Sequence, residues 1–256
     1  MTAHPGALAF DQAVDVYEEA RPEYPAEAIA WLAERLDLRP GRTVLDLGAG
    51  TGKLTRRLVS TGARVIAVEP LPAMRARLIE LVPDAEALDG TAEEIPLGNA
   101  AVDAITVGQA FHWFRLNTAL PELHRVLRPG GALGLIWNLR EGPLDDVLAE
   151  ILRPLRGETP AHADLRWREQ VEASPLFGPF EERDFRWEEQ FEPELLVKRA
   201  LSVSFVAALP PERQDEVAGR VREALSSLPR PIRSRFVTKA FISVRQTSLS
   251  ERPSHR

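Results

Sequence analysis

Between residues 43 and 139 the chain alternates short apolar runs with amphipathic stretches. The apolar runs occupy 43–48, 64–69, 101–108 and 132–138, with a weaker run at 85–88. Helical periodicity separates them at 52–61, 71–81 and 116–128. Near-continuous apolar strands are typical of a parallel sheet buried on both faces, and their alternation with helices is typical of right-handed βαβ units. This part of the chain therefore predicts a doubly wound α/β sheet.

The flanking segments follow different patterns. Before the sheet, we expect a polar helix from Ala13 to Arg21 and an amphipathic helix that follows Pro25 and stops at Pro40-Gly41. After residue 140, helical stretches at 143–153, 193–207 and 211–227 are mixed with β-leaning runs at 180–192 and 235–246. The run at 235–246 is typical of an antiparallel strand that closes a sheet. We therefore expect a mostly parallel, seven-stranded, Rossmann-like sheet with a helical lid and an antiparallel last strand.

Composition narrows the chemistry. The 256 residues include no cysteine and five histidines, which excludes disulfides, thiolate zinc sites and cysteine nucleophiles, and we expect no metal. The formal charge is −6, from 32 basic and 38 acidic residues, whereas nucleic-acid binders usually carry a basic surplus. The N-terminus lacks the pattern of a secretory signal, and no apolar run approaches the ~20 residues of a membrane span. We expect a cytoplasmic protein that binds neither nucleic acid nor membrane.

The densest chemical signal is the string VLDLGAGTG at 44–52, between a predicted strand and a predicted helix. Glycines at such a turn let the backbone approach a ligand closely at the carboxyl end of the sheet. The dinucleotide pattern G-x-G-x-x-G fails because Lys53 replaces its last glycine, and the phosphate-loop pattern fails at Leu47 and Leu54. What remains is an acidic residue, Asp46, ahead of three alternating glycines. Its carboxylate would repel a pyrophosphate and suit a cation or a hydrogen-bond donor.

A second carboxylate, Glu69, ends the next predicted strand, 21 residues after Gly48. An acidic side chain at about this offset accepts hydrogen bonds from the hydroxyls of a ribose and rejects a 2′-phosphate. The two carboxylates together favour a ligand with an unphosphorylated ribose and a positively polarised group. S-adenosylmethionine supplies both.

Across residues 10–139 the chain resembles the class I S-adenosylmethionine-dependent methyltransferases, in the group related to the type 11 and trans-aconitate methyltransferases. The resemblance rests on an ordered series of motifs: DLGAGTG at 46–52, VEP at 68–70, GTAEEIPL at 90–97, VDAITVGQAFHWF at 102–114 and LRPGG at 127–131. The string YEEARPEYP at 17–25 is similar to the family's cofactor-covering lead. Five motifs in this order make coincidence improbable.

The resemblance implies a set of S-adenosylmethionine contacts. The glycine turn and Asp46 would line the methionine and ribose, Glu69 would hold the ribose hydroxyls, and Thr91-Ala92 would lie beside the adenine. Threonine stands where many relatives carry aspartate, which weakens that last contact. The implied cofactor residues are Tyr17, Arg21, Asp46, Gly48, Ala49, Gly50, Thr51, Gly52, Glu69, Pro70, Thr91, Ala92, Gln109, Ala110 and Phe111. Asp46 also has a structural interpretation, as a cap of the following helix.

His112 and Trp113 are the candidate substrate residues, at the mouth of the fourth predicted strand. His112 has two interpretations. It acts on the acceptor as a general base or orienting group, or residues 111–114 form a packed aromatic wedge. The tryptophans Trp167 and Trp187 are expected to fill the core of the lid.

We therefore predict methyl transfer from S-adenosylmethionine to an oxygen, nitrogen or carboxylate of a small molecule. Three alternatives remain: a binding or regulatory protein without turnover, a macromolecule methyltransferase, and a nicotinamide oxidoreductase. Residues 1–40 would cover the cofactor, 41–140 would bind it, 141–246 would form the lid and complete the sheet, and 247–256 would be a frayed tail. A homodimer is left open.

Overall fold

The computed structural model describes residues 14–157, 159 and 166–247, and its core is one sheet. Its strands run in the order β3-β2-β1-β4-β5-β7-β6. They are β1 (Thr43–Leu47), β2 (Arg64–Val68), β3 (Glu86–Leu88), β4 (Val102–Gly108), β5 (Leu127–Glu141), β6 (Glu181–Phe191) and β7 (Ile232–Val244). Strands β1 to β5 are parallel, whereas β7 pairs antiparallel with both β5 and β6. The predicted seven-stranded, mostly parallel sheet with an antiparallel last strand is confirmed.

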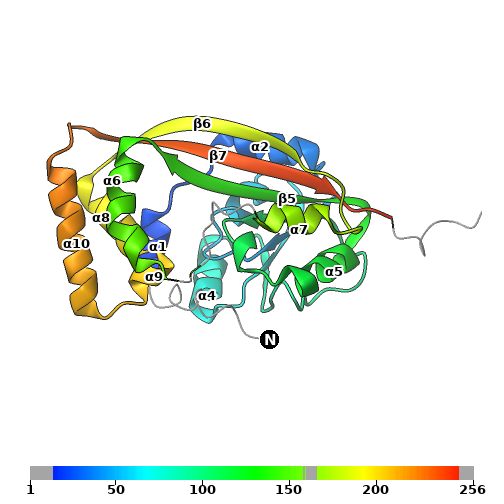
Figure 1. The fold of residues 1–256 in the computed structure, drawn as a ribbon. Helices are drawn as coiled ribbons and strands as arrows, with labels where there is room; N and C mark the ends of the chain where they lie inside the picture. Colours follow the sequence, from blue (N-terminus) through cyan, green and yellow to red (C-terminus); the bar gives the residue numbers. More distant parts are fainter. Residues whose placement is uncertain (1–13, 158, 160–165, 248–256) are drawn as a thin grey trace, which may run out of the picture.

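Helices cover both faces of the sheet and one end of its longest strands (Figure 1). They are α1 (Val14–Ala20), α2 (Ala26–Arg35), α3 (Thr55–Val59), α4 (Pro72–Leu81), α5 (Leu116–Val126), α6 (Pro143–Leu152), α7 (Arg166–Glu172), α8 (Pro193–Leu201), α9 (Ser204–Ala207) and α10 (Pro211–Ser226), with 3₁₀ turns at Phe111–Trp113 and Arg153–Leu155. Alternate residues of β1 show the layering, because Val44 packs with α2 and Leu45 packs with α5. Each face of the sheet therefore has its own apolar core.

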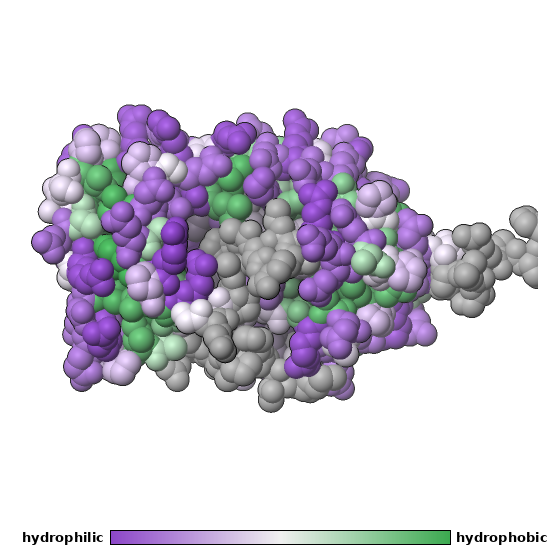
Figure 2. All heavy atoms as spheres, in the orientation of Figure 1, coloured by the Kyte–Doolittle hydropathy of each residue, from purple (hydrophilic) through white to green (hydrophobic). Residues whose placement is uncertain are grey.

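The lid is formed by α6, α8, α9 and α10 beside the ends of β5, β6 and β7 (Figure 1). It has a separate apolar core in which Leu148, Leu196 and Val221 from three helices meet Phe191 and Phe236 from two strands. On the face shown in Figure 2, hydrophilic side chains alternate with smaller hydrophobic patches over the lid.

Several predicted boundaries were wrong. The helix predicted at 52–61 begins only at Thr55, because the preceding residues form the glycine turn. The helix predicted at 193–207 is interrupted between α8 and α9. The apolar run predicted at 132–138 is only part of β5, which already begins at Leu127 and whose register against β4 shifts between the Val102 and Ala104 pairs. The first thirteen residues of the predicted 1–40 segment, and nearly all of the predicted tail, lie outside the described residues.

Trp167 also differs from expectation. Its ring stacks on Trp137 of β5 at 5.0 Å and meets Phe241 of β7 edge-on, so it fills the main core instead of the lid. Trp187 does pack beside the lid, stacked on Phe236 at 4.4 Å.

Candidate functional site

The glycine turn after β1 folds back onto the end of β2. The amides of Gly48 and Ala49 both donate to the carbonyl of Val68, at 2.8 and 3.2 Å. Gly48, Gly50 and Gly52 have φ angles of +69°, +58° and +90°, a region that other residues enter only at a cost. A Cβ on Gly50 would meet no atom within 4 Å, so this turn leaves open space beside its backbone.

Glu69 is buried at the end of β2 and holds the turn in place. One carboxylate oxygen accepts the amide of Gly50 at 2.8 Å, and the other accepts the amide of Leu71 at 2.9 Å. Both carboxylate oxygens of Glu69 therefore bond to backbone amides around the glycine turn. The spacing argument thus brought Glu69 and the glycine turn together correctly in space.

Asp46 is buried beneath the turn, between two hydroxyl groups. Its oxygens accept the hydroxyls of Thr55 at 2.6 Å and Thr106 at 3.2 Å. Burial raises the pKa of Asp46 to about 6, although these hydrogen bonds favour the ionised form. The backbone amide of Thr55, the first residue of α3, also bonds to Asp46, which agrees with the helix-capping interpretation of this carboxylate.

Helix α1 joins the glycine turn to the lid. Glu18 accepts the hydroxyl of Thr51 at 2.5 Å and the guanidinium of Arg56 at 2.6 Å. Burial alone would raise the pKa of Glu18, but these hydrogen bonds hold it below its usual value. At the other end of α1, the carbonyl of Ala20 accepts Arg199 of α8 at 2.7 Å.

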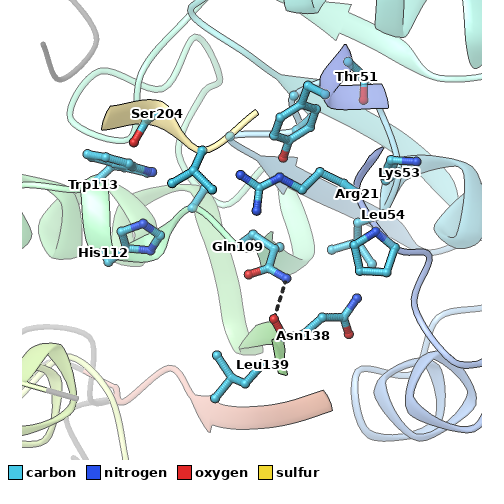
Figure 3. A pocket seen from close by; sticks show the side chains of 18 of the residues that line it. Arg21, Thr51, Lys53, Leu54, Gln109, His112, Trp113, Asn138, Leu139 and Ser204 are labelled. Carbon is cyan, nitrogen blue, oxygen red and sulfur yellow. Dashed lines mark hydrogen bonds between the residues drawn. The ribbon is translucent and has the colours of Figure 1, made fainter. Parts of the chain in front are cut away.

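Tyr17 and Arg21 lie on the inner side of this connection. The guanidinium of Arg21 lies 5.2 Å from the centre of the Tyr17 ring and donates to the carbonyl of Ser202 at 3.2 Å. Burial raises the pKa of the Tyr17 phenol, so the hydroxyl stays protonated at neutral pH. In Figure 3 the Arg21 guanidinium points toward Gln109 across the cavity.

Gln109 and Ala110 follow β4 directly. Gln109 has a φ of +60°, rare for a residue with a side chain, and its amide donates to Ile136 of β5 at 2.9 Å. Its side chain donates to the carbonyl of Asn138 at 3.4 Å (Figure 3). Such left-handed residues persist where the surroundings enforce them, and they cluster at functional sites.

The segment 111–114 divides between the core and the cavity. Phe111 is fully buried and contacts Phe114 and Trp167, at 5.4 and 5.5 Å between ring centres. His112 and Trp113 line the cavity, with their rings 4.8 Å apart. The wedge interpretation thus holds for Phe111, whereas His112 and Trp113 lie at the cavity wall.

One cavity of about 720 Å³ collects most of the predicted site residues. Those lining it are Tyr17, Arg21, Asp46, Gly48, Ala49, Gly50, Thr51, Glu69, Pro70, Thr91, Ala92, Gln109, Ala110, His112 and Trp113. Gly52 and Phe111 do not line it: a Cβ on Gly52 would lie 2.9 Å from Val82, and Phe111 lies in the core. Pockets of this size accommodate small molecules and cofactors.

Three of the polar residues of the cavity wall that the sequence interpretation missed are important below. Asn138 and Arg140 lie near the end of β5, and Arg199 lies on α8. Arg199 shares the buried side of α8 with Leu196 and Ala200, and a charged residue within an apolar helical stripe is the signal that could have identified it.

The described residues contain neither a membrane-spanning helix nor a cluster of metal-binding side chains. None of the helices there is long and apolar enough to cross a membrane. In that same part of the chain, no three histidine, aspartate or glutamate side chains are grouped so as to hold a metal ion.

Comparison with known proteins gives consistent similarities. The model of the family "Methyltransferase domain" matches residues 45–135. Uncharacterised methyltransferases of Mycobacterium tuberculosis and Mycobacterium bovis are each 40% identical over 93% of this chain and 94% of their own length. A methyltransferase-like protein of Schizosaccharomyces pombe is 33% identical over 90% of this chain and 93% of its own.

Solved structures share the fold. A provisionally assigned type II methyltransferase from Anaeromyxobacter dehalogenans aligns over 87% of this chain and 97% of its own, with a TM-score of 0.65 and 26% identity. Phospholethanolamine N-methyltransferase 2 of Haemonchus contortus, in complex with phosphomonomethylethanolamine and S-adenosylhomocysteine, aligns over 93% of this chain and 58% of its own. Its TM-score is 0.58 at 17% identity, a likeness of fold alone.

Proposed function

The chain belongs to the class I methyltransferase family, and from that premise we propose that it transfers a methyl group from S-adenosylmethionine to a small-molecule acceptor. The acceptor atom would be an oxygen, a nitrogen or a carboxylate oxygen. The observation that carries the proposal is the single cavity in which the glycine turn and Glu69 face residues of the lid.

The wall of this cavity fits the cofactor at two points. The hydroxyl of Thr91, at the position expected for adenine, is buried and has no hydrogen-bond partner among the described residues. An adenine ring would offer it one, since buried polar groups are rarely left unsatisfied. The open space beside Gly50 lets a ligand approach the backbone closely, and the carboxylate of Glu69 lines the same cavity.

S-adenosylmethionine, when bound, supplies an activated methyl group on a sulfonium. The chain's own residues then have to orient the acceptor and exclude water, which are large contributions in a displacement reaction. The backbone amide of Gln109 donates a hydrogen bond to the carbonyl of Ile136, which holds the backbone of Gln109 in one conformation. Its side chain lines the cavity. We assign His112 and Trp113 to positioning the acceptor, because both line the cavity beside the end of β4.

Enclosure by the lid favours a small acceptor over a macromolecule. Residues of α6, α8 and α9, including Leu148, Ala200 and Ser204, contribute to the same cavity wall as the glycine turn. A polymer chain would need an open groove, whereas a small molecule can be surrounded on most sides.

The test combines binding and turnover. Calorimetry should show S-adenosylhomocysteine binding, and its saturation should raise the melting temperature, because a ligand that binds only the native state stabilises it. Labelled S-adenosylmethionine with a panel of small acids, phenols and amines should then identify an acceptor. Binding of NAD without binding of S-adenosylhomocysteine would refute the cofactor assignment, and cofactor binding without turnover on any acceptor would favour a non-catalytic role.

A matched glycine pair makes the binding test specific. Gly50→Ala places a methyl group in the proposed cofactor space and should abolish or strongly weaken binding of S-adenosylhomocysteine. Gly41→Ala is the control, because Gly41 also has a positive φ, +88°, and a Cβ there also meets no atom within 4 Å, but it does not line the cavity. If the two variants bind S-adenosylhomocysteine equally well, the cofactor does not approach Gly50.

A further inference from the structure

Several arginines line the lid side of the cavity, and three of them come from separate elements. Arg21 follows α1, Arg140 lies near the end of β5, and Arg199 lies on α8, and all three line the cavity wall. Arg199 is 4% exposed, and the side chain of Arg140 is 15% exposed. Buried guanidinium groups are rare unless they are paired with an anion.

The pairing of these arginines within the described residues is incomplete. Arg199 uses its Nε to donate to Ala20 and packs its face 4.5 Å from the centre of the Phe191 ring, while its Nη1 is buried without a hydrogen-bond partner there. Arg140 has a carboxylate oxygen of Asp145 at 4.0 Å from its Nη1, and its buried Nε has no partner in the same described part. An arginine can donate five hydrogen bonds, so both retain unused donors.

The charges around Arg140 and Arg199 also leave a positive excess. Burial lowers the pKa of Arg140 to about 10 and that of Arg199 to about 9, and the neighbouring arginines add to both effects. Both groups nevertheless remain charged at neutral pH. The carboxylates that counter them are Asp145, whose side chain is 44% exposed, and Glu189, and burial raises the pKa of each. A buried positive surplus is costly, and an anion from outside would relieve it.

We propose that Arg140 and Arg199 form an anion-binding subsite that recognises a carboxylate or phosphate group of the methyl acceptor, an inference that rests on the proposed function. The planar fork of a guanidinium matches the oxygens of either group in a bidentate arrangement. The residues expected to bind the cofactor come from the turns after β1, β2, β3 and β4 and from α1 with the Arg21 that follows it, whereas Arg140 and Arg199 belong to the parts of β5 and α8 that build the lid. The subsite is therefore assigned to the acceptor, and the cofactor is left to the residues of the strand-end turns.

The experiment compares the binding of two anionic probes with that of a neutral probe. Succinate and monomethyl phosphate are titrated separately into protein saturated with S-adenosylhomocysteine, with succinamide as the neutral counterpart of succinate. We expect at least one of the two anions to bind about 10-fold or more tightly than succinamide, since charge-assisted hydrogen bonds are roughly twice as strong as neutral ones. Preference between succinate and monomethyl phosphate identifies the anionic group as a carboxylate or a phosphate.

Variants assign the effect to the arginines. Arg140→Gln should raise the Kd of the preferred anion about 10–100-fold, Arg140→Lys should restore part of the affinity, and both should leave the Kd of S-adenosylhomocysteine within about 2-fold. Arg222→Gln is the control for lost charge on the lid, because Arg222 is exposed on α10 and pairs with Glu194. Arg140 is preferred over Arg199 for substitution, because Arg199 also holds Ala20 and packs on Phe191.

Each alternative result has a separate meaning. Equal affinity of wild-type protein for succinate, monomethyl phosphate and succinamide overturns the subsite, even if Arg140→Gln fails to fold. Loss of S-adenosylhomocysteine affinity in a folded Arg140→Gln protein also overturns it, because the arginine would then hold the carboxylate of the cofactor. Failure of wild-type protein to bind S-adenosylhomocysteine refutes the proposed function itself, independently of the anion results.

Discussion

The buried carboxylate of Asp46 should make the folded protein less stable as the pH rises from 4 to 6. Burial raises its pKa to about 6, against 3.8 for an unperturbed aspartate. Between these values the folded state binds more protons than the unfolded state, so the free energy of unfolding falls with increasing pH. Each pH unit between the two pKa values lowers the free energy of unfolding by about 1.4 kcal/mol. The full loss caused by Asp46 is therefore about 3 kcal/mol above pH 6, and it vanishes below pH 4.

Asp46→Asn removes the titration while keeping the shape of the side chain. Its amide can still bond to both hydroxyls, because those of Thr55 and Thr106 can rotate to donate or accept. We expect the difference in unfolding free energy, variant minus wild type, to grow by about 2 kcal/mol from pH 4.5 to pH 7, the part of the full cost that falls in this range. Other titrating groups cancel in the difference.

The assay is urea unfolding at half-unit pH intervals for both proteins, with equal m-values as the check that the unfolding transition itself is unchanged. A difference that stays constant with pH would show that Asp46 titrates alike in the folded and unfolded states. A difference that shrinks with rising pH would mean that the folded site favours the ionised carboxylate. Either result refutes the reasoning from burial.

Three further variants test other parts of the site. Glu69→Ala should weaken S-adenosylhomocysteine binding by about 1–3 kcal/mol in calorimetry, because hydrogen bonds to a charged acceptor are lost. His112→Asn should lower kcat/KM for the identified acceptor about 10²-fold, because the acceptor loses its positioning contact, with the melting temperature unchanged. Gly48→Ala should lower the free energy of unfolding by about 2–5 kcal/mol, because the residue has a positive φ and a new Cβ would lie 2.8 Å from that of Ala110.

Controls separate binding from structure in these variants. Glu86→Ala removes an exposed carboxylate from β3 and should leave cofactor affinity unchanged. An acidic limb in the pH–rate profile that disappears in His112→Asn would identify a general base in place of a positioning residue. Full turnover of that variant would remove His112 from the site, and wild-type stability of Gly48→Ala would contradict the close contact.

The parallel half of the sheet was predictable because its strands are buried on both faces. The run RVIAV in β2 is apolar after its first residue, which predicts a strand buried on both faces. The polar or glycine-rich turn that follows such a run marks the end of the strand. The end of β5 was not predictable on this basis. Its last residues, 139–141, pair only with β7 and are partly exposed, so they lack the apolar signature of the core strands.

Some contacts across the cavity were likewise predictable from the sequence, and others were not. The approach of Glu69 to the glycine turn follows from β1 and β2 being neighbours in a parallel sheet, which the order of elements already indicated. The approach of Arg199 to Arg140 depends on how α8 packs on the strands of the lid, and that packing is decided by tertiary contacts of Leu196 and Phe236. The side of the cavity at the glycine turn was therefore predictable from motifs, and the side formed by the lid was not.

The continuity of the long strands limits how the cavity can open. β5, β6 and β7 extend without a break from the main core to the lid, with pairs such as Arg140–Phe236 and Phe191–Ile232 near their ends. The lid is thus attached to the main core by three hydrogen-bonded strands. A rigid-body rotation of the whole lid would have to bend these strands. We therefore expect ligands to enter the cavity through smaller displacements. One such displacement is the separation of α1 from the glycine turn, which breaks the hydrogen bond from Thr51 to Glu18.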